Sequence, residues 1–177
     1  MTLFLKRFMG VLVLDSSTFE EIEADRHAAM QSVVVVLLVC LASGFAALGL
    51  GLAGVGGFVA GAVVSLGAWL VWGAVISTVG TVLLPEPTTR SNLLEVLRVL
   101  GYAAAPGVFI AVAAMRSAAT LVLTLVTVWM IAAAVIAVRQ ALDYRSTSRA
   151  VAVCVIAWLM SFGALWAALM IFGTNVS

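Results

Sequence analysis

The chain has 177 residues, of which 64% are hydrophobic and only 10% are charged, and its mean hydropathy is +1.23. Soluble globular domains are roughly half apolar and about a quarter charged, so this composition excludes an ordinary soluble domain and predicts an integral membrane protein. The formal net charge of +1 shows no basic excess, and nucleic acid is therefore not expected as a partner.

The N-terminal segment is predicted to lie on the cytoplasmic surface and in the membrane interface. Apolar residues at nearly helical spacing surround a Lys-Arg pair, a pattern typical of an interfacial helix, with a frayed terminus as the alternative. Ser17 and Thr18 each precede a glutamate by three residues, which is the spacing of a capping box. A short acidic helix is therefore predicted over residues 18–24, outside the bilayer.

Five apolar stretches are each close to the ~20 residues that a helix needs to cross ~30 Å of hydrocarbon. They cover residues 32–51, 58–84, 97–115, 118–138 and 150–172. The fold is therefore predicted to be all-α, a polytopic membrane protein with five transmembrane helices packed as a bundle. Its predicted domains are an N-terminal segment over residues 1–31, a transmembrane domain over 32–172 and a short external tail over 173–177.

The third predicted span contains a proline that should interrupt its helix. Gly101 and Tyr102 lie near its start, and Pro106 interrupts it, because proline removes a backbone hydrogen bond and clashes one turn earlier. In a bilayer the freed carbonyl needs cover from neighbouring helices or hydroxyls, and the Tyr102 hydroxyl is a candidate. Just before this span, Asn92 followed by Glu95 predicts the start of an interfacial helix. The third span is therefore predicted to be kinked and surrounded by the others.

The positions of lysine and arginine predict the orientation. With five spans, eight of the nine basic residues fall on the N-terminal side of the membrane. The positive-inside bias then places the N-terminus in the cytoplasm and the C-terminus outside the cytoplasmic (inner) membrane.

Polar residues cluster directly after the fourth span, in the motif Arg139-Gln140-x-x-Asp143-Tyr144-Arg145. Arg139 and Asp143 are four residues apart, so they are predicted to pair on one helix face. The cluster has two interpretations. It either binds a lipid phosphate or a protein, or it is a helix end whose long side chains reach back to the membrane surface.

Small residues recur along the second span, where Gly57, Gly61 and Ser65 are four residues apart and a further stripe includes Gly73 and Gly80. Small side chains allow helices to approach closely in lipid. The stripe predicts either packing within the monomer or a homo-oligomer interface.

Three threonines, Thr120, Thr124 and Thr127, share one face of the fourth span. Threonines in membrane helices commonly bond to a carbonyl one turn earlier. The alternative is a hydroxyl-lined path beside the break at Pro106.

An enzyme is not expected from this sequence. Charged residues inside membrane spans normally mark pumps, relays or substrate sites, and the five predicted span interiors contain none. Glu20, Glu21 and Arg26 resemble the paired-glutamate and arginine motif of intramembrane proteases, but the spacing to the arginine is one residue too long. His27 is the only histidine and cannot bind a metal alone. No catalytic residue, metal or cofactor is therefore predicted.

The order of these features resembles the Yip family, the Ypt/Rab-GTPase-interacting membrane proteins, and in particular its bacterial members. The resemblance is carried by Phe19-Glu20-Glu21-Ile22-x-x-Asp25, by Gly101-Tyr102-x-x-x-Pro106 and by the stretch over residues 137–144. It implies a non-enzymatic membrane protein that acts through partners, in eukaryotes in vesicle trafficking and membrane shaping. The chain lacks the long N-terminal cytosolic region and the Asp-Leu-Tyr-Gly-Pro motif of eukaryotic relatives, so GTPase binding is not carried over.

The leading functional prediction is a membrane scaffold or interaction protein whose partners are lipids, another membrane protein or a second copy of itself. The alternative is a transporter or channel for a small neutral or lipophilic solute, with a path lined by Tyr102, Pro106, Thr120, Thr124 and Thr127. Predicted partner or lipid contacts are Glu20, Glu21, Asp25, Arg139, Asp143, Tyr144, Arg145 and Arg149. Predicted kink and packing residues are Gly101, Tyr102, Pro106, Gly57, Gly61 and Ser65.

Overall fold

The computed structural model describes residues 2–52, 54–87, 89 and 91–173, and throughout this part of the chain it contains helices and no strand. The α-helices are α1 (Leu3–Leu12), α2 (Ser16–Ala24), α3 (Ala28–Leu50), α4 (Val55–Thr78), α5 (Leu93–Ala103), α6 (Ala119–Ala141) and α7 (Thr147–Gly173). A π-helical segment over Val79–Leu83 continues α4, and 3₁₀ segments cover Ala105–Ala114 and Arg116–Ala118. The side chains of residues 55, 57, 60, 61, 64 and 164–173 lie outside the description. The predicted all-α class is confirmed.

Four helical stretches of the described residues are long and apolar enough to cross a membrane. They are Ala28–Leu50, Ser65–Leu83, Leu93–Ala114 and Arg116–Ala141. A shorter apolar helix covers Thr147–Gly163, the part of α7 whose side chains are described. The protein is therefore a polytopic helical membrane protein, and a fifth crossing by α7 stays a prediction.

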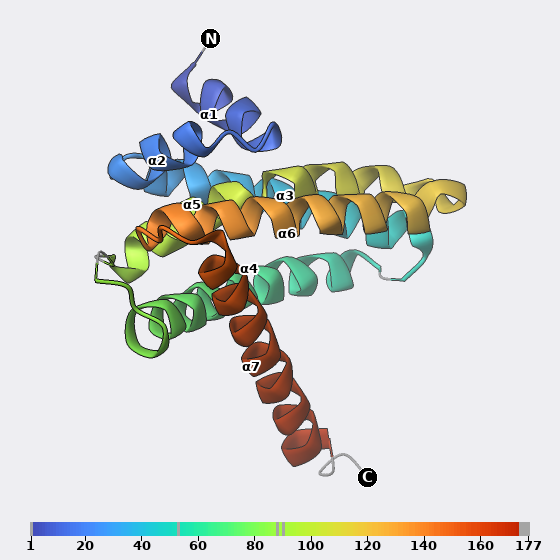
Figure 1. Cartoon of the computed structure of the whole chain (residues 1–177). Coiled ribbons are helices and arrows are strands. Elements are labelled where there is room, and N and C mark those ends of the chain that lie inside the picture. The colour runs from blue at the N-terminus through green and yellow to red at the C-terminus, as the bar shows by residue number, and fades with distance from the viewer. Residues whose placement is uncertain (1, 53, 88, 90, 174–177) are drawn as a thin grey trace.

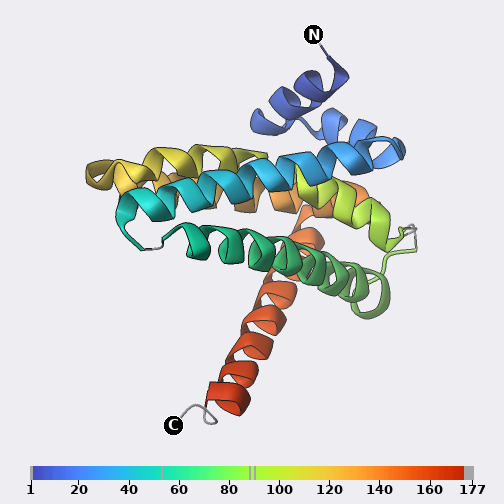
Figure 2. The ribbon, with the colours of Figure 1, turned by 180° about the vertical axis from the view of Figure 1, so that it is seen from behind.

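The helices do not form one parallel bundle of five. Figures 1 and 2 show α3, α4, α6 and the third span running alongside one another, with α1 and α2 together against one side of this group. In both views α7 crosses the bundle next to α4 and carries its far end away from it. Helix α7 therefore packs against the other helices over only part of its length.

The third span changes its helical form at the proline. The capping box of Asn92 and Glu95 opens α5 as predicted, and α5 ends at Ala103. From Ala105 the chain continues as a 3₁₀ segment with Pro106 in its first turn, so the predicted break is confirmed. A 3₁₀ helix rises ~2.0 Å per residue against ~1.5 Å in an α-helix, so the 22 residues of Leu93–Ala114 reach roughly 36 Å. The 3₁₀ form lets a short sequence cross the bilayer.

Glycines place the third span directly against α3. A Cβ added to Gly101 would stand 2.7 Å from the Cβ of Ser32, and one added to Gly107 would stand 2.7 Å from Val39. Real Cβ atoms do not approach so closely, so these positions need glycine if the backbones are to stay in place. Gly101 is a packing residue, as predicted from its sequence context.

At the C-terminal end of α4, the small residues pack against other helices of the same monomer. A Cβ at Gly73 would overlap Leu97, and one at Gly80 would overlap Leu142. Ser65 is exposed, whereas Gly57 and Gly61 lie outside the residues whose side chains are described. The homo-oligomer interpretation therefore stays a prediction for the N-terminal half of the stripe only.

Helix α1 buries one of its two charged residues, Arg7, and exposes part of its apolar surface. Arg7 and Val11 are buried, while Leu3, Met9 and Val13 are exposed. At its C-terminal end, the indole Nε1 of Trp129 in α6 donates to the Leu12 carbonyl at 3.0 Å and covers an unpaired helix-end acceptor. An exposed apolar face suits the predicted interfacial helix.

Candidate functional site

The turn between α1 and α2 is closed by an aspartate. The carboxylate of Asp15 accepts hydrogen bonds from the Ser17 backbone N–H at 3.1 Å, from the Ser17 hydroxyl at 2.8 and 2.9 Å and from the Thr18 hydroxyl at 2.7 Å. Asp15 is therefore the N-cap of α2, which begins at Ser16. The prediction that Ser17 or Thr18 caps this helix is wrong, because both hydroxyls donate to the stronger carboxylate acceptor instead.

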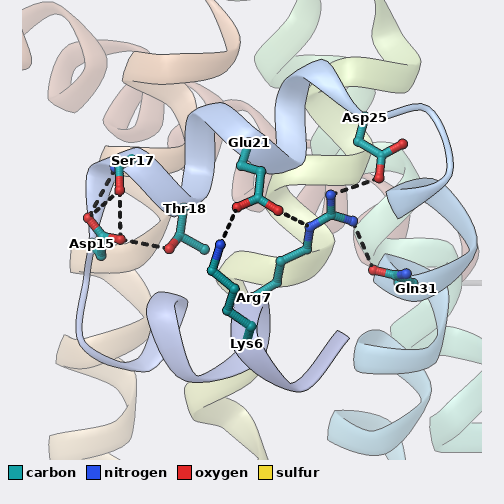
Figure 3. A network of polar contacts seen from close by, with 8 residues as sticks. All are labelled: Lys6, Arg7, Asp15, Ser17, Thr18, Glu21, Asp25 and Gln31. Carbon is teal, nitrogen blue, oxygen red and sulfur yellow. Dashed lines mark hydrogen bonds and ion pairs between the residues drawn. The ribbon is translucent and has the colours of Figure 1, made fainter. Parts of the chain in front are cut away.

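A buried arginine joins α1 to α2 and α3 (Figure 3). The side chain of Arg7 is only 3% exposed. Its Nε donates to Glu21 Oε1 at 3.1 Å, its Nη2 to Asp25 Oδ2 at 2.7 Å and its Nη1 to Gln31 Oε1 at 3.2 Å. Lys6 adds a more exposed ion pair to Glu21 at 3.1 Å. We refer to Arg7, Glu21, Asp25 and Gln31 as the Arg7 cluster.

The third span contributes a phenol to the Arg7 cluster. The fully buried Tyr102 donates its hydroxyl to Gln31 Oε1 at 2.6 Å, so this amide oxygen accepts from α1 and from α5 at once. The ring of Phe4 lies 6.3 Å from the ring of Tyr102. The expectation that the Tyr102 hydroxyl covers the break at Pro106 is wrong, because that hydroxyl is committed to Gln31.

Two further contacts fix α2 above the ends of α5 and α6. Arg98, buried in α5, donates from Nη1 to the Glu23 carbonyl at 2.7 Å. Gln140 of α6 donates to Glu20 Oε1 at 2.7 Å. Burial raises the pKa of Glu23, with smaller contributions from the negative charges of Asp143 and Glu95. The carboxyl groups of Glu95 and Asp143 are therefore close enough to Glu23, where α2 meets these helices, to act on its ionisation.

A second polar cluster joins the end of α4 to the start of α7. The Tyr144 hydroxyl lies 2.8 Å from the carbonyl oxygens of both Gly80, near the start of the π-helical segment, and Leu84, the residue that follows it. Arg149 donates to the Pro85 carbonyl at 2.8 Å and pairs with Glu86 at 3.3 Å. We refer to Glu86, Tyr144 and Arg149, together with Arg139 and Arg145, as the Glu86 cluster.

The remaining members of the predicted basic motif lie around the same cluster. The backbone N–H of Arg145 donates to Glu86 Oε2 at 3.0 Å, and Arg139 Nε donates to the Tyr144 carbonyl at 3.4 Å. Asp143 takes a left-handed backbone conformation, with φ of 52°. Its predicted pairing with Arg139 stays a prediction.

The structure sorts the predicted contact residues into two groups. Glu21 and Asp25 belong to the Arg7 cluster, and Arg139, Tyr144 and Arg149 belong to the Glu86 cluster, so the side chains of these five make contacts within the monomer. Glu20, in the middle of α2, and Asp143 and Arg145, just after α6, are exposed.

Sequence reasoning missed Gln31, Asp15 and Glu86 as organising residues. One signal was present for Gln31, which is a lone amide at the entrance of an apolar span.

An apolar cavity of about 850 Å³ lies between the third span and helices α3, α4, α6 and α7. Of the five residues predicted to line a transport path, Thr127 lines this cavity. The Thr124 hydroxyl instead bonds back to the Thr120 carbonyl at 2.9 Å, which confirms the back-bonding interpretation for that residue.

Acidification is expected to loosen α1 from α2. Hydrogen bonds from Arg7 to Asp25, and from Lys6 and then Arg7 to Glu21, lower the pKa of both carboxyls. A lowered folded-state pKa gives stability that is complete above the unfolded-state value and is lost as pH falls through the folded-state value. The docking should therefore hold from neutral pH to about pH 4 and weaken below it. The raised pKa of Glu23 acts in the opposite direction.

Hydrogen–deuterium exchange of the α1 amides, corrected for the intrinsic effect of pH, measures this change. Protection should fall below about pH 4 in the parent protein. In an Asp25→Asn variant the remaining pH dependence should be smaller. Equal pH dependence in the two proteins would contradict the assignment.

A scan against protein families matches the chain to the Yip1 domain over residues 9–169. Searches of curated proteins and of solved structures found no match. The match covers α2 to α6 entirely, together with most of α7 and the end of α1, and so includes the Glu86 cluster, the broken third span and every member of the Arg7 cluster except Arg7 itself. The chain therefore belongs to the Yip1 domain family.

Proposed function

We propose that the protein is a non-enzymatic scaffold of the cytoplasmic membrane that acts through protein or lipid partners. The observation that carries this proposal is the surface formed where α2 covers the ends of α5 and α6. Glu20, Asp143 and Arg145 are exposed there, while the Arg7 and Glu86 clusters hold the elements beneath them. A firmly held surface with exposed charges of both signs suits recognition of a partner.

Three observations support a role without catalysis. The Yip1 domain is not known as an enzyme family. Among the described residues, no group of three or more histidine, cysteine, aspartate or glutamate side chains could hold a metal ion. The charged side chains of the described spans, Glu95, Arg98, Arg116 and Arg139, lie towards span ends.

The orientation proposed from the basic residues places this surface in the cytoplasm. Both clusters contain arginines counted on the N-terminal side, namely Arg7, Arg145 and Arg149. Arg90, another of that group, lies outside the described residues.

Native mass spectrometry of the protein, extracted into nanodiscs directly from its own membrane, tests the scaffold proposal. A stoichiometric partner or a defined oligomer is expected for the parent protein. Arg145→Glu should lower the occupancy of that complex about tenfold, because a rim charge is reversed, and Arg145→Lys should retain it. Arg149 is unsuitable for this test, since its loss would disrupt the Glu86 cluster. Equal recovery with Arg145→Glu and with the parent would exclude this surface.

A second candidate is the handling of a small lipophilic solute, which the cavity beside the third span favours. Of the residues proposed to line a transport path (Tyr102, Pro106, Thr120, Thr124 and Thr127), Thr127 lines the cavity. The hydroxyls of Tyr102 and Thr124 donate hydrogen bonds to Gln31 and to the Thr120 carbonyl. Solute flux in proteoliposomes separates this candidate from the scaffold. Absence of flux for the parent protein would end it.

A further inference from the structure

A pocket of about 430 Å³ lies between the π-helical end of α4 and the start of α7. Its apolar lining residues include Leu83, Leu84 and Pro85, and its polar lining residues are Ser146, Ser148 and Arg149. Among the described residues that line it, only Arg149 is charged. The pocket therefore combines one cation and two hydroxyls with an apolar surface, which suits an oxyanion attached to an apolar group.

Arg149 retains hydrogen-bond donors after its contacts within the monomer. Its Nη1 donates to the Pro85 carbonyl at 2.8 Å, and its Nε lies 3.3 Å from Glu86 Oε1. These contacts use two of the five guanidinium N–H groups. The side chain is 39% exposed and lines the pocket, so the guanidinium is accessible to a ligand there.

The two serines supply a further donor. Their hydroxyl oxygens lie 2.6 Å apart, and either serine can be the donor of this bond. The serine that accepts keeps its own hydroxyl hydrogen, which can be donated to a third group. Ser148 is exposed and Ser146 is half-buried, and both line the pocket. A charged oxygen acceptor would bind here more strongly than a neutral one, because charge-assisted hydrogen bonds are the stronger kind.

The carboxylate of Glu86 does not reverse this preference for an anion. Its side chain is only 10% exposed and is not part of the pocket lining. Its Oε1 pairs with Arg149 and its Oε2 accepts from the backbone N–H of Arg145 at 3.0 Å, so both oxygens are engaged. Arg139, Arg145 and Arg149 also outnumber Glu86 and Asp143 along this part of the chain. The surroundings of the pocket are therefore net positive.

The pocket lies at the depth where membrane phosphates are expected. The second candidate span ends at Leu83, and α7 begins at Thr147, so the pocket is at the edge of the membrane-crossing part of the fold. Leu83 is 58% exposed and can contact lipid chains. Basic pockets between spans on the cytoplasmic side are typical sites for anionic lipid headgroups.

We propose that this pocket binds the phosphate group of an anionic phospholipid. The phosphate pairs with Arg149 and accepts a hydrogen bond from Ser146 or Ser148, and the lipid chains lie along Leu83. This lipid site rests on the proposed scaffold function, for which it names the lipid partner. The two remain separable, because the scaffold test changes Arg145 and the test of the pocket leaves Arg145 unchanged.

The test uses the full chain in a maltoside detergent, which carries neither charge nor phosphate. Native mass spectrometry measures how much dioleoyl phosphatidate the protein retains, and how much diolein, which has the same chains without the phosphate. The parent should retain phosphatidate about tenfold more than diolein. Replacing both Ser146 and Ser148 by alanine should lower phosphatidate retention about tenfold and leave diolein unchanged.

Matched controls lie next to the substituted residues. Thr147→Ala, between the two serines but outside the lining, should retain phosphatidate as the parent does. Ala152→Phe places a ring in the pocket and should abolish the preference for phosphatidate, whereas Val151→Phe, exposed and outside the lining, should keep it. Arg149 is left in place, because it also holds the Glu86 cluster together.

Three outcomes would overturn the proposal. Equal phosphatidate retention by the parent, the double serine variant and Ala152→Phe would place any lipid binding elsewhere. That result, together with a protein complex lost in Arg145→Glu, would remove the lipid site and leave the scaffold standing. Equal retention of phosphatidate and diolein by the parent would remove the role of the phosphate. Displacement of phosphatidate by an equal concentration of inorganic phosphate would make free phosphate the ligand.

Discussion

Replacing Arg7 by methionine is expected to release α1 from the rest of the protein. The guanidinium is buried and donates to Glu21, Asp25 and Gln31, so its loss removes a donor from all three, although Glu21 keeps Lys6 and Gln31 keeps the Tyr102 hydroxyl. Removing one partner of a fully buried ion pair costs about 3–5 kcal/mol. The carboxylates of Glu21 and Asp25 are 35% and 26% exposed and can be rehydrated, so we expect about 2 kcal/mol here.

Hydrogen–deuterium exchange in nanodiscs measures this loss. A cost of about 2 kcal/mol corresponds to exchange about 30-fold faster for the α1 amides that exchange through undocking. The α3 and α6 amides should change little, because those helices keep their own packing. Lys6→Met is the matched control: its ammonium is 63% exposed and makes one ion pair to Glu21, so its loss should change exchange only slightly. Unchanged α1 exchange in Arg7→Met would show that the apolar contacts alone hold the hairpin.

The membrane class of the fold could be predicted because each span is predominantly apolar over about 20 residues. The break in the third span followed from proline chemistry, and the capping box of Asn92 and Glu95 followed from a local spacing. These features depend on residues within one or two helical turns. Local patterns therefore suffice for them.

The direction of α7 could not be predicted from its composition. Its described part, Thr147–Gly163, is apolar on most sides, so the pattern does not indicate which face packs. For a similar reason, the sequence could not show whether Gly73 and Gly80 pack within the monomer or against a second copy. Small residues show that something approaches closely, but only the structure identifies Leu97 and Leu142.

The Arg7 cluster was missed because its members are far apart in the sequence. In the sequence, Arg7 is one of several basic residues, and Gln31, 24 residues later, is the last residue of the predicted N-terminal segment. The cap at Asp15 was missed for another reason. Asp15, Ser17 and Thr18 are all good caps, and two of them matched a capping-box spacing. Asp15 is the cap because its carboxylate is the strongest hydrogen-bond acceptor of the three and accepts from the hydroxyls of both Ser17 and Thr18.

Replacing Gly101 by leucine is expected to separate the third span from α3. Gly101 is buried, and even a Cβ at this position would meet the Cβ of Ser32 at 2.7 Å and the Ser32 carbonyl oxygen at 3.2 Å. Ser32 donates its hydroxyl to the Ala29 carbonyl at 2.7 Å, so it cannot move aside without loss. Overpacking a closely packed core typically costs about 1–3 kcal/mol, and a leucine against backbone should reach the upper end.

The contacts next to Gly101 should carry the effect of Gly101→Leu to helix α1. Tyr102, the next residue, donates to Gln31, which is one residue before Ser32, so moving the two helices apart stretches the 2.6 Å bond that joins the third span to the Arg7 cluster. Gly101→Leu should therefore lower the thermal midpoint of unfolding and also speed hydrogen exchange in α1. Gly67→Leu is the control, because a Cβ there meets nothing within 4 Å, so that variant should keep the parent's midpoint and exchange. If both variants lowered the midpoint equally, the effect would come from leucine in a span rather than from the contact of Gly101 with Ser32.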